Sequence, residues 1–365
     1  MRKGRGRRLC RLLVVLALLV AGCGTPATTK PSEGAPFAPT PSPDPAAVCK
    51  DCWPLSGKPA KLGAVDRRPL LVKIDNVPAA RPHYGLSEAD MVFEIIVEGS
   101  FTRLAAIFHS QDTKTIGNIR SARLADRSLT PMVRGALVYS GTSAYEVPLI
   151  QSDAAQGKYV DLSADYTQGY YRVTFRPGPY NMFTSASAMR EAIAAKGANT
   201  SQTVPSWGFF ANPEHDPKLG GMAGSVAATQ LTIPYREDQC RVEYTYDPQT
   251  RTYARSQNAN GKPVRDIDAN NKQPIAAANV LVVKTEIWEV AEIVDSSGAH
   301  AHDMRLVGGG EASVFRDGLR QDGVWARASE TEPFVFKSQT GERIVLNPGQ
   351  TWIHVVPNDW TITSQ

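Results

Sequence analysis

The sequence predicts an α/β (α+β) layered first domain with a mixed sheet, followed by a mostly antiparallel, β-rich second domain. Two observations support this prediction. In residues 61–228, apolar runs of strand length alternate with helix-like segments, a pattern typical of layered α/β folds. In residues 229–365, short β-rich runs follow one another through turn-forming links such as DPQT and RDG. About 300 residues are enough for two domains with their own cores.

The first 22 residues have the features of a secretory signal peptide. Six basic residues up to Arg11 precede an apolar run at 12–20 that is too short to span a bilayer comfortably. The run ends in Val-Ala-Gly-Cys, which resembles the lipobox of bacterial lipoproteins, whose cysteine takes a diacylglycerol. We therefore predict cleavage of residues 1–22, a lipid with palmitate-type acyl chains on Cys23, and an extracytoplasmic protein anchored to a bacterial membrane.

Removal of the leader changes the charge of the chain. It takes away six of the 40 basic residues and none of the 36 acidic ones, so the net charge becomes about −2. The mature chain therefore gives no electrostatic reason to expect a nucleic-acid partner. Residues 23–60 begin with a stretch rich in Pro, Ala, Thr and Ser, which predicts a disordered tether.

Cys49 and Cys52 have the C-x-x-C spacing of redox pairs. They follow a linker and open no visible strand-to-helix unit, where a redox thiol would be expected. A local disulfide or free thiols are the preferred interpretation, with redox or metal chemistry as the alternative.

The elements of the first domain follow from the order of apolar runs and capping residues. A buried strand comes first, then a hairpin, two further strands and three helices. Thr142 or Ser143 would cap the second helix and Thr184 or Ser185 the third, which Gly197 would end. The predicted strands are 70–75, 91–97, 102–109, 116–119 and 136–141, and the predicted helices are 124–135, 142–151 and 184–197.

Charged side chains gather at the strand ends and loops of this domain, which is where open α/β sheets bind ligands. The candidate ligand-binding residues are Asp75, Asp90, Arg103, Arg120, Arg123 and Arg172. Arginine presents a planar fork that matches phosphate or carboxylate, and Asp75 with Asp90 could hold a hydrated Mg²⁺. The alternative is a set of solvated salt bridges. Both interpretations stay open for Arg120 and Arg123, whereas Arg127 is expected on a helix surface.

The sequence contains no G-x-S-x-G, no H-E-x-x-H and no P-loop. The hydrolase and nucleotide-binding classes that carry these motifs are therefore not indicated, and we predict no catalytic residues from motifs.

A resemblance to a known family rests on longer stretches. The run LLVKIDNVPAARPHYGLSEADMVFEIIVEG, the I-R-S-x-R motif and YYRVTFRPGPYNMFTS resemble the N-terminal domain of the YerB-like bacterial lipoproteins, the family of domain of unknown function 3048. RVEYTYDPQTRTY, VGGGEASVFRDG and LNPGQTWIHVVP resemble its C-terminal companion domain. The resemblance covers residues 69–357 and implies a lipoprotein architecture without a known activity.

A more distant similarity concerns chemistry. The order of an Asp-ended strand, an acidic SEAD, a hairpin and a strand that delivers an arginine is similar to the LytR-CpsA-Psr transferases. These enzymes bind a polyprenyl pyrophosphate with arginines and Mg²⁺ and move glycopolymers onto the cell wall. The similarity implies metal-side roles for Asp75 and Asp90 and a pyrophosphate role for Arg120. Ser121 replaces the acid that follows the arginine in those enzymes.

Three functions are therefore in competition. The first is binding of an anionic, phosphate-containing or lipid-linked ligand of the cell envelope through the arginines. The second is a glycopolymer or phosphoryl-type transferase. The third is an envelope interaction module without a small ligand, whose protein partner the sequence does not name.

Overall fold

The structure is a computed structural model that describes residues 49–365 except 62–63, 237–238 and 296. The predicted signal peptide, the lipidation site Cys23 and the first part of the predicted tether lie outside the described residues.

The folded body begins earlier than the sequence predicted. Leu55 and Ser56 are fully buried, and Trp53 is nearly so. The backbone N–H of Cys49 donates to the carbonyl of Phe209. The prediction of a disordered tether up to residue 60 is therefore wrong for residues 49–60, because an apolar CWPL stretch packs onto the core. The three described cysteines form no disulfide with one another.

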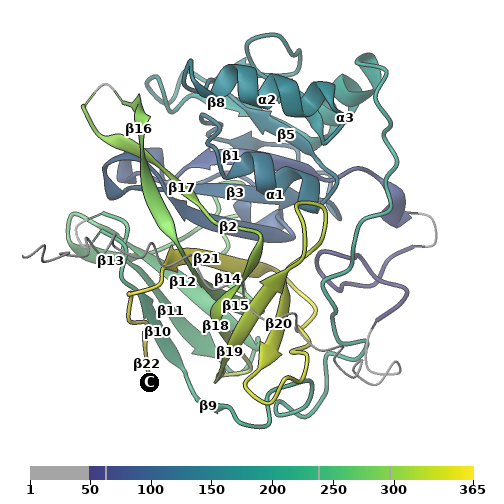
Figure 1. Cartoon of the computed structure of the whole chain (residues 1–365), viewed down its shortest axis with the longest axis vertical. Coiled ribbons are helices and arrows are strands. Elements are labelled where there is room, and N and C mark those ends of the chain that lie inside the picture. Colours follow the sequence, from purple (N-terminus) through teal and green to yellow (C-terminus); the bar gives the residue numbers. More distant parts are fainter. Residues whose placement is uncertain (1–48, 62–63, 237–238, 296) are drawn as a thin grey trace, which may run out of the picture. The chain divides into compact units, whose positions relative to one another are not determined.

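A large mixed sheet, called here the central sheet, runs through the described body (Figure 1). Its strands β2 and β21 pair in parallel, so strands from 61–228 and from 229–365 form one continuous sheet. In spatial order the strands are β20 (Val335–Ser338), β19 (Leu319–Arg327), β18 (Gly308–Arg316), β15 (Asn279–Thr285), β21 (Thr351–Pro357), β2 (Met91–Ile96), β3 (Thr102–Phe108), β1 (Leu70–Asp75), β5 (Ala136–Tyr139) and β6 (Val160–Ser163), with β9 (Val226–Ala227) beside β19.

We call residues 61–228 the first half of the chain and residues 229–365 the second half. Strands β1, β2 and β3 lie at the centre of the first half. Every residue of the three strands is buried, which explains why they appear in the sequence as continuous apolar runs. The predicted hairpin is confirmed, since β2 and β3 pair antiparallel. Because β1 also pairs antiparallel with β3, β1 and β2 run in the same direction.

The three helices cover both faces of this half. Buried residues of α1 (Asp126–Met132) and α2 (Glu146–Ala155) belong to the core on one face, and those of α3 (Ala186–Ala195) belong to the core on the other. Ser185 caps α3 by accepting the N–H of Ala188. At the start of α2, Ser143 and Glu146 exchange hydrogen bonds as a capping box.

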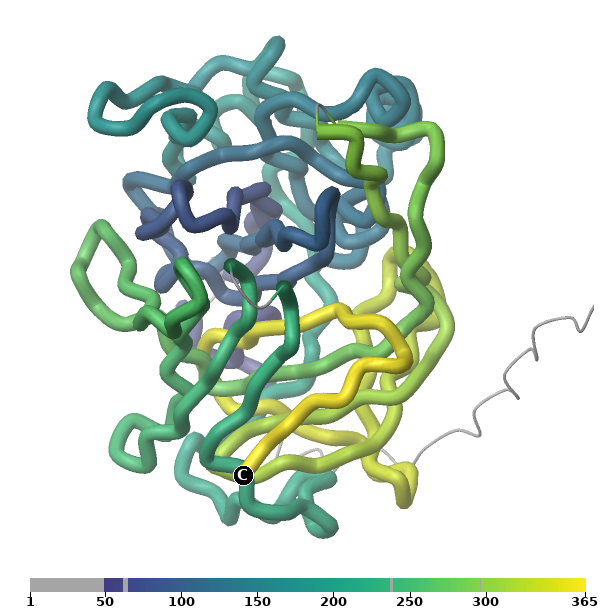
Figure 2. Tube along the Cα trace, turned by 90° about the vertical axis from the view of Figure 1, so that its left-hand side faces the viewer, coloured from purple at the N-terminus to yellow at the C-terminus, as the bar shows by residue number. Residues whose placement is uncertain are grey.

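The second half adds an antiparallel sheet, called here the small sheet, that packs against the central sheet. Figure 2 shows most of the green and yellow tube of residues 229–365 below the blue part of residues 61–228, with a light-green segment that rises beside it on the right. The predicted fold class, with an α/β first part and a mostly antiparallel β-rich second part, is confirmed. The division at residue 228/229 stays a prediction. The strands of the small sheet are β13 (Lys262–Arg265), β12 (Thr252–Ala259), β11 (Val242–Asp247), β10 (Gln230–Ile233) and β22 (Thr363–Ser364), with β14 (Ala276–Ala277) beside β12.

Two smaller sheets complete the fold. The long hairpin of β16 (Ile287–Val294) and β17 (His300–Met304) packs beside Glu98–Ser100, the short helix η4. The second of these is a three-stranded sheet, formed by β4 (Ile116–Gly117), β8 (Met182–Thr184) and β7 (Tyr171–Arg172). None of the helices in the described ranges is long and apolar enough to span a bilayer.

Three fully buried histidines predict loss of stability in acid. Burial lowers the pKa of His83 to about 3 and of His109 to about 4, and holds the pKa of His354 well below its usual value. The unfolded chain takes up these protons near pH 6.5 and the folded chain does not, so stability falls as the pH drops below that value. Each histidine contributes up to about 1.4 kcal/mol per pH unit. His109→Gln is expected to reduce the slope between pH 6 and pH 5 by that amount in urea unfolding, and an unchanged slope would contradict the assignment.

Candidate functional site

Several of the predicted site residues meet at the carboxyl end of β1. Asp75 is the last residue of β1 and lies opposite Arg103 on β3. The chain after β4 returns along β1, since the N–H of Arg120 donates to the carbonyl of Lys73. The backbone therefore brings Asp75, Arg103 and Arg120 to one edge of the central sheet.

Arg120 is held by one carboxylate and remains open to solvent. Its Nε donates to Asp75 Oδ2 at 2.8 Å, and its side chain is 29% exposed. The other carboxylate oxygen, Asp75 Oδ1, accepts the backbone N–H of Asn76 and lies near that of Val77. Within the described ranges neither terminal nitrogen of Arg120 has a hydrogen-bond acceptor. The guanidinium is thus oriented through Nε while two donor nitrogens stay free.

Arg123 is fully engaged in the protein. Its Nε lies 2.5 Å from Glu98 Oε1, its Nη2 donates to Glu98 Oε2 at 2.8 Å, and its Nη1 donates to the carbonyl of Ala122. Burial raises the pKa of Glu98, but Arg123 outweighs this effect and leaves the pKa lowered. Arg123 therefore forms a buried bidentate ion pair, and the salt-bridge interpretation holds for this residue.

Arg103 has no carboxylate of its own. Its Nη1 donates to the carbonyl of Ser121 at 3.2 Å, and its Nη2 lies 3.9 Å from the Glu98 oxygen that Arg123 already holds. Burial, and next the charge of Arg123, lower the pKa of Arg103 to about 10. Three guanidiniums therefore share two carboxylates. We call Arg103, Arg120 and Arg123 with Asp75 and Glu98 the arginine cluster.

A buried ion pair lies next to the arginine cluster. Lys73 Nζ is 2.9 Å from Asp126 Oδ1, and both side chains are fully buried. Burial lowers the pKa of Lys73 and raises that of Asp126. The other oxygen of Asp126 accepts the N–H of Arg123. Glu146 is also buried, and it accepts from Thr142 and Ser143 instead of from an arginine.

The structure does not bring Asp90 to this edge. Asp90 precedes β2, whereas Asp75 ends β1, and the two strands run in the same direction. Asp75 lies opposite Arg103 on β3, whereas the N–H of Asp90 donates to the carbonyl of Ile107 on the same strand. Four strand residues, or roughly 13 Å along β3, therefore separate Asp75 from Asp90. The prediction that Asp75 and Asp90 together hold Mg²⁺ is therefore wrong. Asp90 instead accepts the N–H groups of His109 and Ser110, and the described residues contain no group of three or more side chains that could hold a metal.

Two other arginines lie apart from the cluster. Arg172 is exposed on β7 and donates to Asn181 Oδ1 at 2.7 Å. No hydrogen bond or ion pair of the described residues joins it to the arginine cluster. Arg127 lies on α1 and pairs with Asp153 of α2 at 2.6 Å, which confirms the expectation of a helix-surface residue.

Sequence reasoning missed a second charged cluster, on the opposite face of the central sheet. Glu94 in the middle of β2 and Arg255 on β12 are fully buried, and Arg255 Nη2 lies 2.7 Å from Glu94 Oε2. Arg255 Nη1 also pairs with Asp266, and its guanidinium lies over the ring of Trp352. The available signal was a glutamate inside the apolar run MVFEIIV, since a charge there needs a buried partner.

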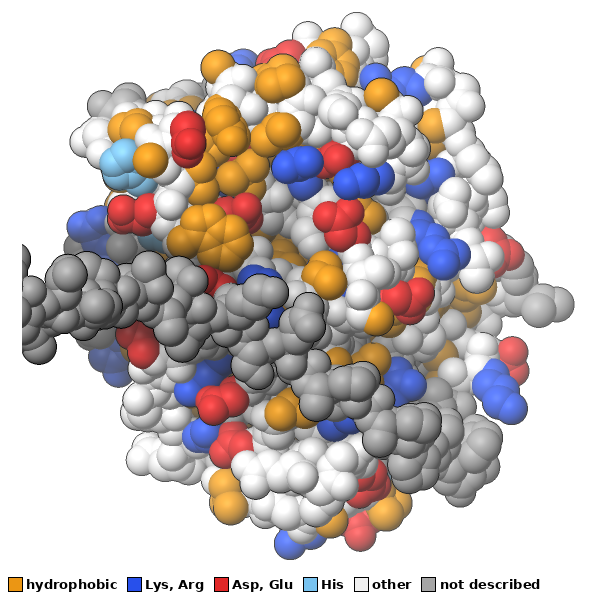
Figure 3. All heavy atoms as spheres, in the orientation of Figure 1, with side chains coloured by type: hydrophobic (Ala, Val, Ile, Leu, Met, Phe, Trp, Pro, Cys, Tyr) orange, Lys and Arg blue, Asp and Glu red, His pale blue; other side chains and the backbone are white. Residues whose placement is uncertain are grey.

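Exposed hydrophobic side chains gather on one face of the molecule. Figure 3 shows them at the upper left, where Figure 1 places α2 and the β16–β17 hairpin. Tyr145 and Val147 near the start of α2 and Trp288 and Val294 on β16 are between 38% and 50% exposed. This surface would suit an interaction module, but the described residues do not indicate what covers it.

Comparison with known proteins places both halves of the chain in one family. The family described as "Protein of unknown function (DUF3048)" matches residues 55–199 with its N-terminal domain and residues 231–353 with its C-terminal domain. The chain is 29% identical over 317 residues to the Bacillus subtilis (strain 168) protein named "Putative lipoprotein YerB", covering 84% of this chain and 86% of that protein. The crystal structure of the YerB protein from Bacillus subtilis superposes with a TM-score of 0.71 at 28% identity, covering 86% of this chain and 100% of that chain.

Proposed function

The chain belongs to the DUF3048 family, and we propose that it binds an anionic, phosphate-containing ligand of the cell envelope through Arg120 and Arg103. The proposal includes an extracytoplasmic location and a lipid anchor on Cys23, which lies outside the described residues. The signal-peptide pattern and the lipoprotein name of the Bacillus relative support that location.

One observation carries the ligand proposal. Arg120 is fixed through Nε by Asp75 and keeps both terminal nitrogens without an acceptor among the described residues. A phosphate group can accept from these two nitrogens, which are already oriented. Less conformational freedom is then lost on binding. Arg103 adds a second positive charge, which shares the carboxylate of Glu98 with Arg123 at 3.9 Å.

The transferase alternative finds less support in the geometry. It needs a pair of acids that hold Mg²⁺ beside the arginine, and Asp75 and Asp90 do not form one. Binding without transfer is therefore the function that the arginine cluster supports best. Only the transferase alternative predicts that the protein turns over a substrate and needs Mg²⁺ to do so.

Arg120→Ala is expected to weaken binding of a pyrophosphate compound at least tenfold. A hydrogen bond between charged groups contributes about 1.5 to 3 kcal/mol, and a tenfold change in affinity corresponds to about 1.4 kcal/mol. The measurement is calorimetric titration of the purified full chain with farnesyl pyrophosphate and, separately, with inorganic pyrophosphate. Arg305→Ala is the matched control, because Arg305 is 42% exposed, lies apart from the arginine cluster, and makes a 4.0 Å ion pair with Glu286 and a hydrogen bond to the carbonyl of Gly309.

The two titrants separate recognition of the phosphate from recognition of the lipid. Binding of both, with loss of both in Arg120→Ala, supports a phosphate site. No binding of either compound to the unaltered chain, or equal binding to the unaltered chain and Arg120→Ala, would contradict the proposal.

A further inference from the structure

The two cysteines of the CKDC stretch, Cys49 and Cys52, lie where the folded body begins. The backbone N–H of Cys49 donates to the carbonyl of Phe209 at 2.8 Å, and Cys52 pairs with Pro59 in an antiparallel bridge. Separate contacts therefore hold each of the two cysteines on the body. Cys52 is 7% exposed, whereas Cys49 is partly exposed and accessible to a reagent in solution.

The backbone between the two cysteines brings their side chains together. The chain bends at Lys50 and Asp51. A four-residue turn places its end Cα atoms within about 7 Å of each other, and a disulfide joins Cα atoms about 4.4 to 6.8 Å apart. Burial first, and then a hydrogen bond to Cys49, raise the pKa of the Cys52 thiol to about 12. The two thiols are therefore neighbours in the folded chain.

We propose that Cys49 and Cys52 form a reversible disulfide in this protein. The co-reactant is another disulfide, such as oxidised glutathione. The thiolate of Cys49, the more exposed of the pair, attacks one sulfur of this oxidant, and the other oxidant sulfur leaves as a thiol with the proton that Cys49 lost. Cys52 then attacks the sulfur of Cys49, and the second oxidant sulfur leaves with the proton of Cys52. Two thiols of the protein are oxidised, and one disulfide is reduced to two thiols.

The bond strengthens the point at which the predicted tether meets the folded body. It closes a ring over Lys50 and Asp51 and joins the residue that contacts Phe209 to the CWPL stretch on the core. Disulfides persist outside the cytoplasm, so the occurrence of this bond in the cell rests on the extracytoplasmic location proposed above. Its formation in the purified protein depends neither on that location nor on binding of a phosphate ligand.

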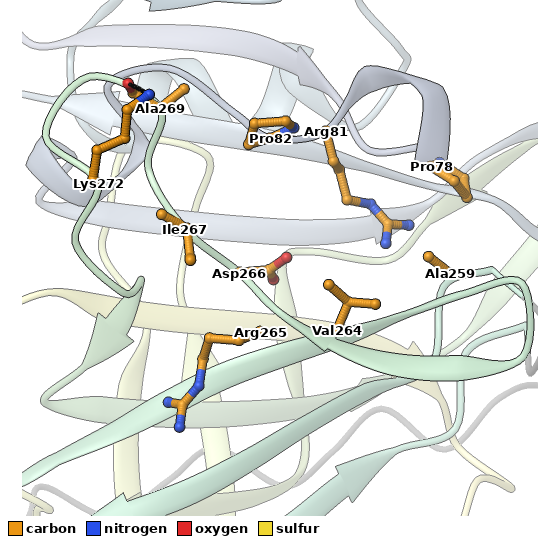
Figure 4. Close-up of a pocket in the computed structure, with 10 residues that line it drawn as sticks. All are labelled: Pro78, Arg81, Pro82, Ala259, Val264, Arg265, Asp266, Ile267, Ala269 and Lys272. Atoms are coloured by element: carbon orange, nitrogen blue, oxygen red, sulfur yellow. Dashed lines mark hydrogen bonds between the residues drawn. The ribbon is translucent and has the colours of Figure 1, made fainter.

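Cys240 is an internal control, because its surroundings differ from those of the CKDC pair. It is fully buried, and burial raises the pKa of its thiol. The carbonyl of the preceding residue, Gln239, accepts from Arg81, which lines a cavity of about 380 Å³ (Figure 4). None of the described cysteines is bonded to Cys240. Cys240 should therefore stay a thiol under conditions that oxidise the CKDC pair.

The experiment incubates the purified full chain with mixtures of reduced and oxidised glutathione, quenches the exchange with acid, and alkylates the remaining thiols in denaturant. Cleavage after glutamate leaves Cys49 and Cys52 in one peptide, residues 34–88, which contains no other cysteine. Mass spectrometry is expected to find this peptide without alkyl groups and with two hydrogen atoms fewer than its reduced form. The peptide that contains Cys240 is expected to be alkylated.

A parallel titration of the chain in urea separates the effect of the fold from that of the C-x-x-C spacing. At the same glutathione composition, the ratio of disulfide to dithiol is expected to be at least tenfold higher in the folded chain, because folding holds the two thiols together. Cys52→Ser is expected to stop at the mixed disulfide between Cys49 and glutathione. The proposal is overturned if the folded chain carries alkyl groups or glutathione at Cys49 and Cys52 in every mixture, or if the folded and unfolded chains give the same ratio.

Discussion

Lys73→Met is expected to lower the free energy of unfolding by about 3 to 5 kcal/mol, because removal of one partner leaves a buried charge without compensation. Lys73 and Asp126 are both fully buried and 2.9 Å apart. Burial already raises the pKa of Asp126, so without Lys73 this carboxyl group would have to take up a proton in the folded state. The measurement is urea unfolding of the purified full chain at pH 7.

A double replacement separates the pair from the packing around it. Lys73→Met with Asp126→Leu is expected to recover at least half of the loss, since apolar residues often replace a buried ion pair at little cost. Recovery is partial because the N–H of Arg123 loses the Asp126 acceptor. Lys284→Met is the control, as Lys284 pairs with the 77% exposed Glu311 and should change stability by less than about 1 kcal/mol. A loss below about 1 kcal/mol in Lys73→Met would contradict the argument.

The local elements could be predicted from the sequence because their signals are local. LLVKID and MVFEIIV are apolar runs of strand length, and both are strands. Ser185 caps the helix it precedes. The pairing of β2 with β21 could not be predicted in this way, because the two strands lie about 260 residues apart and neither pattern specifies its neighbour.

The candidate site was predicted in part for the same reason. Asp75, Arg103 and Arg120 meet because β1, β3 and the return after β4 are close in sequence. The prediction for Asp90 was wrong because it did not distinguish an acidic residue that precedes a strand from one that follows a strand. Asp75 follows its strand, whereas Asp90 precedes its own, and parallel direction puts them at opposite edges.

The charge balance of the site could not be predicted from residue types. Glu98 lies in the turn between β2 and β3, and the structure shows that it holds Arg123 through both oxygens. Asp75 accepts from Nε of Arg120, so the terminal nitrogens of Arg120 are not used by this carboxylate. Neighbouring arginines of one motif therefore differ in the donors they leave free, according to the position of single carboxylates.

Arg255→Met is expected to destabilise the protein by about 3 to 5 kcal/mol at pH 8, and by less at lower pH. Arg255 is the shared partner of Glu94 and Asp266, with which it connects the small sheet to the central sheet. Burial raises the pKa of Glu94, and Arg255 opposes this effect. Without Arg255 the pKa of Glu94 rises further, and the folded state holds the protonated carboxyl group.

The pH dependence of the penalty distinguishes an uncompensated charge from lost packing. The unfolded chain already has Glu94 ionised above about pH 5, so the proton uptake in the folded variant costs about 1.4 kcal/mol less for each unit that the pH is lowered. His354 Nδ1 lies 3.6 Å from Glu94 and its pKa is lowered by burial and next by Arg255. Its protonation in the variant would therefore act in the same direction. Urea unfolding of both chains at pH 8 and pH 6 should show a penalty about 2 to 3 kcal/mol smaller at pH 6.

Two further variants complete this test. Glu94→Gln with Arg255→Met removes the Glu94 carboxylate and should make the difference between the penalties at pH 8 and pH 6 smaller than in Arg255→Met alone. Arg305→Met, which replaces a 42% exposed arginine, should change stability by less than about 1 kcal/mol at either pH. If the penalty in Arg255→Met is the same at pH 8 and pH 6, Arg255 stabilises the protein through its stacking on Trp352 and not through its charge.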